Sequence, residues 1–231
     1  MINGKSVLTV IPARGGSKGL PRKNILPLAD KPLILWTIEK ANKSKYIDRC
    51  IISTDDQEIA DIAKYGGGDV PFIRPKELAL DNTPTSEVLL HALKTINEKY
   101  DILLVLQPTT PLRSLEDIDG ALETFVARNA SSLVSVCEST QPPEWSVIID
   151  KDNFFGNSAK LLMKEKRRQD YKKTYDLNGS IFLSNVNTYK KTKSFYSQEA
   201  VAYIIPKERS IDIDDKFDLD FAEYLLGIKL E

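Results

Sequence analysis

Four segments of the chain consist almost entirely of apolar residues, a pattern typical of strands buried on both faces of a sheet. They are VLTVIP (7–12), CIIST (50–54), ILLVLQP (102–108) and SLVSVCE (132–138). Three further short runs with strand character lie at 70–75, 180–185 and 200–206. Continuous rather than alternating hydrophobicity favours parallel strands that are covered by helices on both sides.

Amphipathic segments separate these runs, with apolar residues that recur at the spacing of one helix face. Helices are predicted over 33–44, 55–68, 85–100, 115–129 and 216–230. The alternation of strand and helix through residue 138 indicates βαβ units. The pattern therefore predicts an α/β fold of three layers, with a Rossmann-like, mostly parallel sheet.

The alternation stops at residues 139–178, which are polar, basic and irregular. The chain has no internal repeat and no low-complexity linker, so we expect one domain over 1–231 with an excursion at 139–178. Several apolar side chains of this excursion have little regular structure to bury them: Trp145, Val147, Ile148, Ile149, Phe154 and Phe155. An isologous dimer would give them an interior, and we predict a homodimer.

Composition excludes several classes of function. The 231 residues include 32 Lys and Arg against 33 Asp and Glu, so no global charge attracts nucleic acid or an anionic membrane. No apolar run approaches the ~20 residues of a membrane span, and the first residues do not resemble a secretory signal. The only histidine, His91, excludes a multi-histidine zinc site, and Cys50 and Cys137 are expected to be reduced thiols of a cytoplasmic protein.

Residues 13–24, ARGGSKGLPRKN, directly follow the first predicted strand. Ligands of open α/β sheets bind outside the carboxyl ends of the strands. Three glycines allow close approach of the backbone, and four cations (Arg14, Lys18, Arg22 and Lys23) crowd this one loop. The combination predicts a polyphosphate site, although neither the Walker nor the dinucleotide glycine pattern is present. The alternative is a solvated basic turn.

Asp212 and Asp214 stand two positions apart in SIDIDD, which puts both carboxylates on one side of an extended segment. Paired hard oxygens suit Mg²⁺, which is usually held by one or two carboxylates, waters and substrate phosphates. The alternative is an acidic helix start ahead of 216–230, which the helix dipole also favours.

Three other motifs contain polar residues at sites where a ligand is expected. LQPTTPLR (106–113) ends the most apolar strand, and RP (74–75) with LALDNTPT (78–85) ends the third. The excursion contains Arg167, Arg168 and Gln169, followed by Tyr175, Asn178 and Gly179. A basic pair suits a carboxylate, but a solvated surface explains it equally well.

These motifs together resemble the CMP-N-acylneuraminate synthetases, the sialic-acid cytidylyltransferases, with their relatives for legionaminic and pseudaminic acid. The resemblance rests on ARGGSKGLPRKN, RPKELALDNTPT, LLVLQPTTPLR, RRQ…Y…NGSIF and SIDIDDKFDLD, in order over about residues 6 to 228. It implies a fold of the nucleotide-diphospho-sugar transferase type. It also implies the reaction of CTP with a nine-carbon 2-keto sugar acid to give the CMP-sugar acid and pyrophosphate, with Mg²⁺.

Site residues follow from the same resemblance. Arg14, Lys23 and Asp214 would be catalytic, and Asp212 and Asp214 would bind Mg²⁺. The residues expected to bind the nucleotide are Arg14, Gly15, Gly16, Ser17, Lys18, Lys23, Asn24, Arg74, Thr83 and Thr85. Those expected to bind the acid are Gln107, Arg168, Gln169, Tyr175 and Asn178. In the family the excursion also forms the dimer and helps to close the partner's sugar site.

Two residues, Trp145 and Asp176, depart from the pattern of the sialic-acid enzymes. Both lie in the half of the sequence that the resemblance assigns to recognition of the sugar acid. With Phe182 and Phe195, Trp145 would make the end of the pocket apolar, which favours a legionaminate-type acid. A cytidylyltransferase for another acid, such as KDO or pseudaminate, is the alternative within this class. A non-catalytic nucleotide-sugar-binding protein is the alternative outside it.

Overall fold

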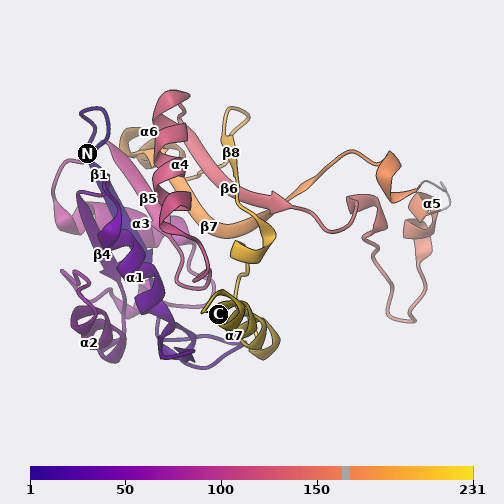
Figure 1. Ribbon diagram of the computed structural model, residues 1–231, viewed down its shortest axis with the longest axis horizontal. Helices are drawn as coiled ribbons and strands as arrows, with labels where there is room; N and C mark the ends of the chain where they lie inside the picture. The colour runs from indigo at the N-terminus through magenta and orange to yellow at the C-terminus, as the bar shows by residue number, and fades with distance from the viewer. Residues whose placement is uncertain (163–166, 231) are drawn as a thin grey trace.

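The computed structural model describes residues 1–162 and 167–230, and a mixed sheet forms its centre (Figure 1). Within these residues the sheet has six strands in the order β4-β1-β5-β7-β6-β8. Their bounds are β1 (Val7–Pro12), β4 (Arg49–Ser53), β5 (Ile102–Leu106), β6 (Ser132–Glu138), β7 (Tyr175–Asn185) and β8 (Val201–Ile204). β1 is parallel to β4 and β5, and β6 is parallel to β8. β7 is antiparallel to both β5 and β6.

Helices cover both faces of this sheet, as the apolar pattern predicts. α1 (Leu33–Lys43), α2 (Gln57–Tyr65) and α4 (Leu115–Ala127) pack on one face in a common core. α3 (Thr85–Ile96) and α6 (Val186–Thr192) pack on the other. α7 (Lys216–Leu230) builds a third, smaller core with the small hairpin of β2 (Pro27–Leu28) and β3 (Lys31–Pro32). The three-layer α/β prediction is confirmed.

Short elements complete the chain. α5 (Ala159–Leu162) lies in the excursion. The 3-10 turns are η1 (Lys23–Ile25), η2 (Lys76–Leu78), η3 (Pro143–Trp145), η4 (Gly156–Ser158), η5 (Arg168–Asp170) and η6 (Lys207–Arg209). No helix among the described residues is long and apolar enough to cross a membrane.

Three details of the sequence prediction were wrong. Residues 70–75 form no strand; Ile73 makes an isolated bridge to Thr54, and Asp69, just before the segment, makes one to Ile51 of β4. α6 was not predicted, because its sequence has few apolar positions. β7 begins at Tyr175 rather than 180, because Tyr175 and Leu177 pair with Glu138 and Val136 of β6. The excursion therefore ends at residue 174, and Tyr175 and Asn178 belong to the sheet.

The strand directions place several segments at one edge of the sheet. β1, β4, β5, β6 and β8 all end at this edge, and antiparallel β7 begins there, since Leu106 of β5 pairs with Ile181. The residues that follow β1, β5 and β8 and the first residues of β7 are thus neighbours. In Figure 1 the excursion leaves β6 on one side and projects away from this body, with α5 at its far end. Residues 163–166 of the excursion lie outside the described part.

Candidate active site

A cleft of about 360 Å³ opens at this edge, and we call it the main cleft. It is lined by the loop after β1, the segment before α3, the loop after β5 and the segment before α7. The predicted site residues in its wall are Arg14, Gly16, Ser17, Lys23, Asn24, Arg74, Thr83, Thr85, Gln107, Asp212 and Asp214. Fold and sequence motifs therefore meet at one place, although the motifs are spread over most of the chain.

The loop of residues 13–24, which we call the cation loop, is anchored to the residues that follow β4. The Gly15 N–H donates to Asp55 Oδ1 at 3.1 Å, and the Asn24 amide donates to the carbonyl of Arg14 at 2.9 Å. A Cβ atom on Gly15 would lie 2.8 Å from an oxygen of Asp56, so only glycine fits this approach. Gly16 has open space on its cleft side and leaves its backbone accessible.

The four cations of the loop pair with carboxylates in three different places. Arg14 and Lys18 both bind Asp81 across the main cleft, at 2.9 and 3.1 Å. These contacts lower the pKa of Asp81, Lys18 being the principal cause. Arg22 turns away to the start of α2 and pairs with Asp56 and with Glu58. The contact with Asp56 raises the pKa of Arg22 and lowers the pKa of Asp56. Arg22 is therefore an anchor of the loop and not a wall of the cleft.

Lys23 connects the cation loop to the predicted metal residues. Its side chain is 13% exposed, and Nζ donates to the Ile213 carbonyl at 2.8 Å and to Asp214 Oδ1 at 3.0 Å. Gly19 also approaches this segment, since a Cβ there would overlap the carbonyl oxygen of Asp214. Asp214 itself is 80% exposed toward the cleft, where a bound ligand would meet it.

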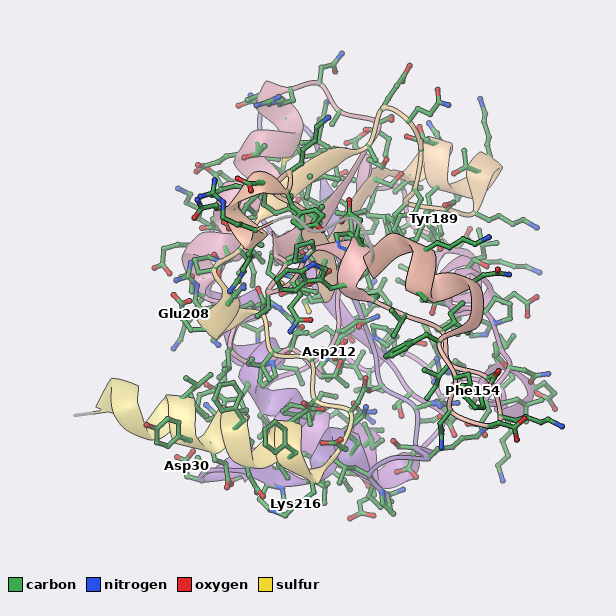
Figure 2. All side chains as sticks on the ribbon, turned by 90° about the vertical axis from the view of Figure 1, so that its right-hand side faces the viewer. Asp30, Phe154, Tyr189, Glu208, Asp212 and Lys216 are labelled. Carbon is green, nitrogen blue, oxygen red and sulfur yellow. The ribbon has the colours of Figure 1, made fainter. Side chains whose placement is uncertain are left out.

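Asp212 is the buried member of the pair. Figure 2 shows it between the body of the protein and α7, and its Oδ1 is buried without a hydrogen-bond partner among the described residues. Burial raises its pKa, and the neighbouring Asp214 adds to the shift, whereas a hydrogen bond with the Thr109 side chain and the charges of Lys23 and Arg113 oppose it. Gly179, at φ +66°, makes room: a Cβ atom there would lie 2.8 Å from Asp212 Oδ2.

These two carboxylates fit a divalent cation. An orphaned, desolvated carboxylate oxygen is costly unless a charge pairs with it, and Mg²⁺ bound to phosphates supplies that charge. The described residues contain no group of three or more His, Cys, Asp or Glu side chains that would hold an ion by themselves. Asp212 and Asp214 would therefore hold the ion together with substrate oxygens and water.

Another part of the lining of the main cleft contains a buried arginine, Arg74. Arg74 is only 3% exposed; its guanidinium lies 3.4 Å from Asp55, and its Nε is buried without a partner among the described residues. Burial lowers its pKa, although Asp55 counters the effect. Thr83 and Thr85 stand beside it, with the apolar side chains of Leu78, Leu80 and Val88. An acceptor on a bound base would satisfy Arg74.

Gln107 stands at the opening of a second hollow, the side pocket, of about 260 Å³. Gln107 and Thr85 line both spaces, so the two are adjacent at these residues. Four of the other residues that line the side pocket are aromatic, namely Phe182, Tyr189, Phe195 and Tyr196, and the rest are Pro84, Ser86, Val105, Lys193 and Ser194. Phe195 packs against Phe182 and Tyr189, with ring centroids 5.4 and 4.6 Å apart.

The structure does not bring the other predicted sugar residues to the clefts of their own chain. Arg168 and Gln169 line a separate hollow in the excursion, and Tyr175 is exposed at the start of β7. Asn178 is buried beneath the cleft, where its amide donates to Ser210 and its oxygen accepts from Ser135. Its hydrogen bonds hold β7 to β6, so the structure gives Asn178 a scaffold position and not a place in the wall. Gly15 and Lys18 lie next to the main cleft without lining it.

Several residues of the site were not predicted. Asp55 and Asp56 follow β4 directly, and the rule that ligand groups follow the strand ends would have found them. Asp81 and Thr109 lie in two of the motifs that the sequence singled out, but neither was among the predicted site residues. Tyr189 and Tyr196 have no local signal, because only the fold brings them to the side pocket.

Comparisons with known proteins agree with this geometry. A sequence model of the cytidylyltransferase family matches residues 8–227. The chain is 37% identical to an N-acylneuraminate cytidylyltransferase of Escherichia coli over 94% of its own length, but it spans only 51% of that relative. It is 36% identical to a CMP-N,N'-diacetyllegionaminic acid synthase of Legionella pneumophila, over 97% of this chain and 98% of the relative.

The fold is also found in solved structures. A CMP:2-keto-3-deoxy-manno-octonic acid synthetase complexed with CTP superposes with a TM-score of 0.74 at 16% identity, over 97% of this chain and 99% of the other. At this identity the likeness concerns the fold alone. The match of the family model over nearly the whole chain confirms the resemblance seen in the motifs, and the chain belongs to the cytidylyltransferase family.

Proposed function

We propose that this protein is a CMP-nonulosonate synthetase, which transfers the cytidylyl group of CTP to a nine-carbon 2-keto sugar acid and releases pyrophosphate. One observation carries the proposal. Cations, a buried arginine and two aspartates from distant segments line one cleft, and a pocket with four aromatic side chains adjoins it at Gln107 and Thr85. Family membership and the two relatives above support the same chemistry.

The nucleotide would occupy the main cleft. Its triphosphate would lie along the cation loop, where Arg14, Lys18 and Lys23 supply charge and Gly16 exposes backbone. Arg14 and Lys18 hold Asp81 in this structure, and the phosphates would take over these contacts. The base would lie between Arg74 and the threonines. The unpartnered Arg74 Nε is a donor placed for its carbonyl oxygen.

The sugar acid would occupy the side pocket, with its anomeric hydroxyl at Gln107, where the pocket meets the main cleft. The hydroxyl oxygen attacks the α-phosphorus as the bond from phosphorus to the bridging oxygen breaks, and pyrophosphate leaves. Such a transfer depends on positioning and on charge neutralisation. Arg14 and Lys23 would stabilise the leaving charge, and Asp214 is the proposed acceptor of the proton.

Mg²⁺ is the proposed cofactor, held by Asp212 and Asp214. When bound, it supplies positive charge that neutralises the phosphate oxygens. The residues of this chain prepare the site: Gly179 allows Asp212 to stand close to Gln107, and Lys23 orients Asp214. The orphaned Oδ1 of Asp212 is the observation that supports a cation here.

We further propose a homodimer in which the excursion of one protomer closes the side pocket of its partner. Arg168 and Gln169 line a hollow that lies apart from the clefts of their own chain, so they can contact substrate only if a second copy brings them there. We place the enzyme in the cytoplasm, where CTP is made. The free thiols of Cys50 and Cys137 suit a reducing compartment.

A pyrophosphate-release assay with CTP tests the function. A panel of N-acetylneuraminate, legionaminate, pseudaminate and KDO should give Mg²⁺-dependent turnover with at least one nine-carbon acid, whereas KDO should be poor. Best turnover with KDO would favour the alternative substrate class. CTP binding without turnover on any acid would favour a nucleotide-sugar-binding protein.

A further inference from the structure

Arg113 is the largest side chain that the described residues bury completely. It follows the loop after β5, and its guanidinium donates to three hydroxyls and one carbonyl. Nε donates to Ser180 Oγ at 3.0 Å and Nη1 to Thr37 Oγ1 at 3.3 Å. Nη2 donates to the Gln107 carbonyl and to Thr110 Oγ1. Among the described residues, no carboxylate forms an ion pair with it.

A buried cation that has only neutral partners is costly, so its presence needs a reason. Burial lowers the pKa of Arg113 to about 9, which leaves it charged at neutral pH; Asp212 and Asp117 counter the shift. Asp117 is already neutralised, because both of its oxygens accept from Arg209 at 2.8 and 2.9 Å. Asp212 is therefore the carboxylate that remains to compensate the charge of Arg113.

The hydrogen bonds of Arg113 lead to the two groups that face the substrate. Its Nη2 holds both ends of the Gln107–Thr110 turn. In the middle of that turn, the carbonyl of Thr109 accepts the N–H of Ile213 at 2.8 Å, and Ile213 stands between Asp212 and Asp214. Nε holds Ser180, which follows Gly179, the residue that leaves room for Asp212 and Gln107.

We propose that Arg113 is the positioning residue of this site, resting on the function proposed above. It fixes the Gln107–Thr110 turn through its hydrogen bonds to both ends. Through the Thr109 carbonyl, which accepts from Ile213, it also positions the Asp212–Asp214 segment. Lysine cannot replace it, because only the guanidinium fork reaches the turn, Ser180 and Thr37 together. Its effect should fall on the metal and the sugar acid and spare the nucleotide base, whose contacts lie on the opposite wall.

Three variants separate this role from a merely structural one. Arg113→Lys keeps the charge but loses the fork. Thr110→Val removes one acceptor on the turn and keeps Arg113. Thr37→Val is the matched control: it removes a partner of the same guanidinium on α1, away from the cleft. Thermal unfolding of all three reports the structural cost, and Thr110→Val tests the inference if Arg113→Lys does not fold.

Two readouts are measured on folded protein: Mn²⁺ binding by electron paramagnetic resonance with CTP present and no acid, and the KM values of both substrates. Arg113→Lys and Thr110→Val should weaken Mn²⁺ binding and raise the KM of the acid by about fivefold or more, while the KM of CTP stays within about threefold. Thr37→Val should lower the melting temperature and leave both readouts unchanged.

Lower melting temperatures with unchanged Mn²⁺ binding and unchanged acid KM in Arg113→Lys and Thr110→Val would overturn the inference. So would an equal effect of Thr37→Val. The Mn²⁺ measurement needs no sugar acid. A wild-type protein that turns over no acid would therefore defeat the proposed function, and the role of Arg113 would still be decided by the comparison of variants.

Discussion

Lys23 and Asp214 are 191 positions apart in the chain, and the lysine Nζ lies 3.0 Å from the Asp214 Oδ1. The same Nζ also donates to the carbonyl of Ile213. A lysine of the cation loop thus holds the segment that carries the proposed metal ligands. In the proposed function, phosphate binding and metal binding would be coupled through this side chain, and removal of Lys23 should affect both.

The first prediction concerns the cations of the loop. Arg14→Ala and Lys23→Ala should each lower kcat/KM for CTP by roughly 10²-fold, because charge that accumulates on the leaving pyrophosphate loses its partner. Arg22→Ala is the control, since Arg22 belongs to the same loop but pairs with Asp56 and Glu58. It should cost stability by about 1 kcal/mol or less and change kcat/KM little. Near-wild-type turnover in both Arg14→Ala and Lys23→Ala would defeat the assignment.

The second prediction concerns the exposed metal ligand. Asp214→Ala should abolish turnover at millimolar Mg²⁺ and leave the fold intact, because this carboxylate faces the cleft and not the core. EDTA should have the same effect on the wild-type protein, reversed by added Mg²⁺. Asp215→Ala is a matched control beside it, outside the residues that line the cleft. Full activity in EDTA would show that the metal proposal is wrong.

The third prediction concerns the buried ligand and pH. The pKa of Asp212 is raised, chiefly by burial, so the folded state holds its proton more tightly than the unfolded state. Its ionised form therefore costs stability at pH values above the ordinary aspartate pKa of about 4, and this cost is absent below that value. Asp212→Asn should raise the free energy of unfolding at pH 7, with a gain that shrinks as the pH falls toward 4, and should lower kcat by roughly 10²-fold.

Denaturant unfolding of wild type and Asp212→Asn at pH 7, 6 and 5 measures this difference. Asp214→Asn, on an exposed carboxylate, is the comparison variant and should show no comparable trend. A stability gain that grows as the pH falls would contradict the stated sign.

The elements on the amino-terminal side were predictable because local pattern decides them. β1 and β5 are fully buried apolar runs, and the residues after them must lie at the ligand edge. The place of β7 between β5 and β6 was not predictable, because strand order is a non-local property. β7 contains Gly179 at positive φ, and its register against β6 shifts between Val134 and Val136; neither feature announces its partner in the sequence.

The same division holds within the site. The spacing of Asp212 and Asp214 indicated a cation, and the glycines with Arg14 and Lys23 indicated phosphate. The diversion of Arg22 to Asp56, and the complete burial of Arg113, depend on partners that only the fold supplies. Charge in a motif thus predicts the class of ligand, whereas tertiary contacts decide which of the charges face it.

The fourth prediction concerns assembly. The excursion and the adjacent strand carry exposed apolar side chains, among them Ile148 at 83%, Phe154 at 68% and Leu177 at 61%. A second copy that buries them gains the free energy of their removal from water. Sedimentation should therefore give about twice the chain mass of 26.0 kDa.

Phe154→Asp should weaken this dimer and lower turnover with it, because the partner's Arg168 would leave the site. Phe217→Asp, on the equally exposed face of α7, is the control and should change neither. A fully active monomer at micromolar concentration would rule out the shared site.

The last prediction concerns the preferred acid. Of the three aromatics expected at the far end of the sugar site, Phe182 and Phe195 do line the side pocket. Trp145 lies in the excursion against Tyr171, and Asp176 is exposed and bonded to Ser139, so neither contacts a sugar in its own chain. The four aromatic side chains of this pocket suit legionaminic acid, in which a methyl replaces the hydroxymethyl of N-acetylneuraminic acid and an acylamino group replaces a hydroxyl. Because an apolar pocket discriminates by only ~1–3 kcal/mol, we expect a legionaminate-type acid to be preferred and N-acetylneuraminate to be turned over more slowly.

Phe182→Tyr places a hydroxyl in the wall of this pocket and should narrow the preference for the legionaminate-type acid, whereas Tyr65→Phe, on the exposed end of α2, should leave this preference unchanged. Measurement of kcat/KM for both acids decides the matter: a preference of about tenfold for N-acetylneuraminate would overturn this assignment of the acid and leave the cytidylyltransferase chemistry standing.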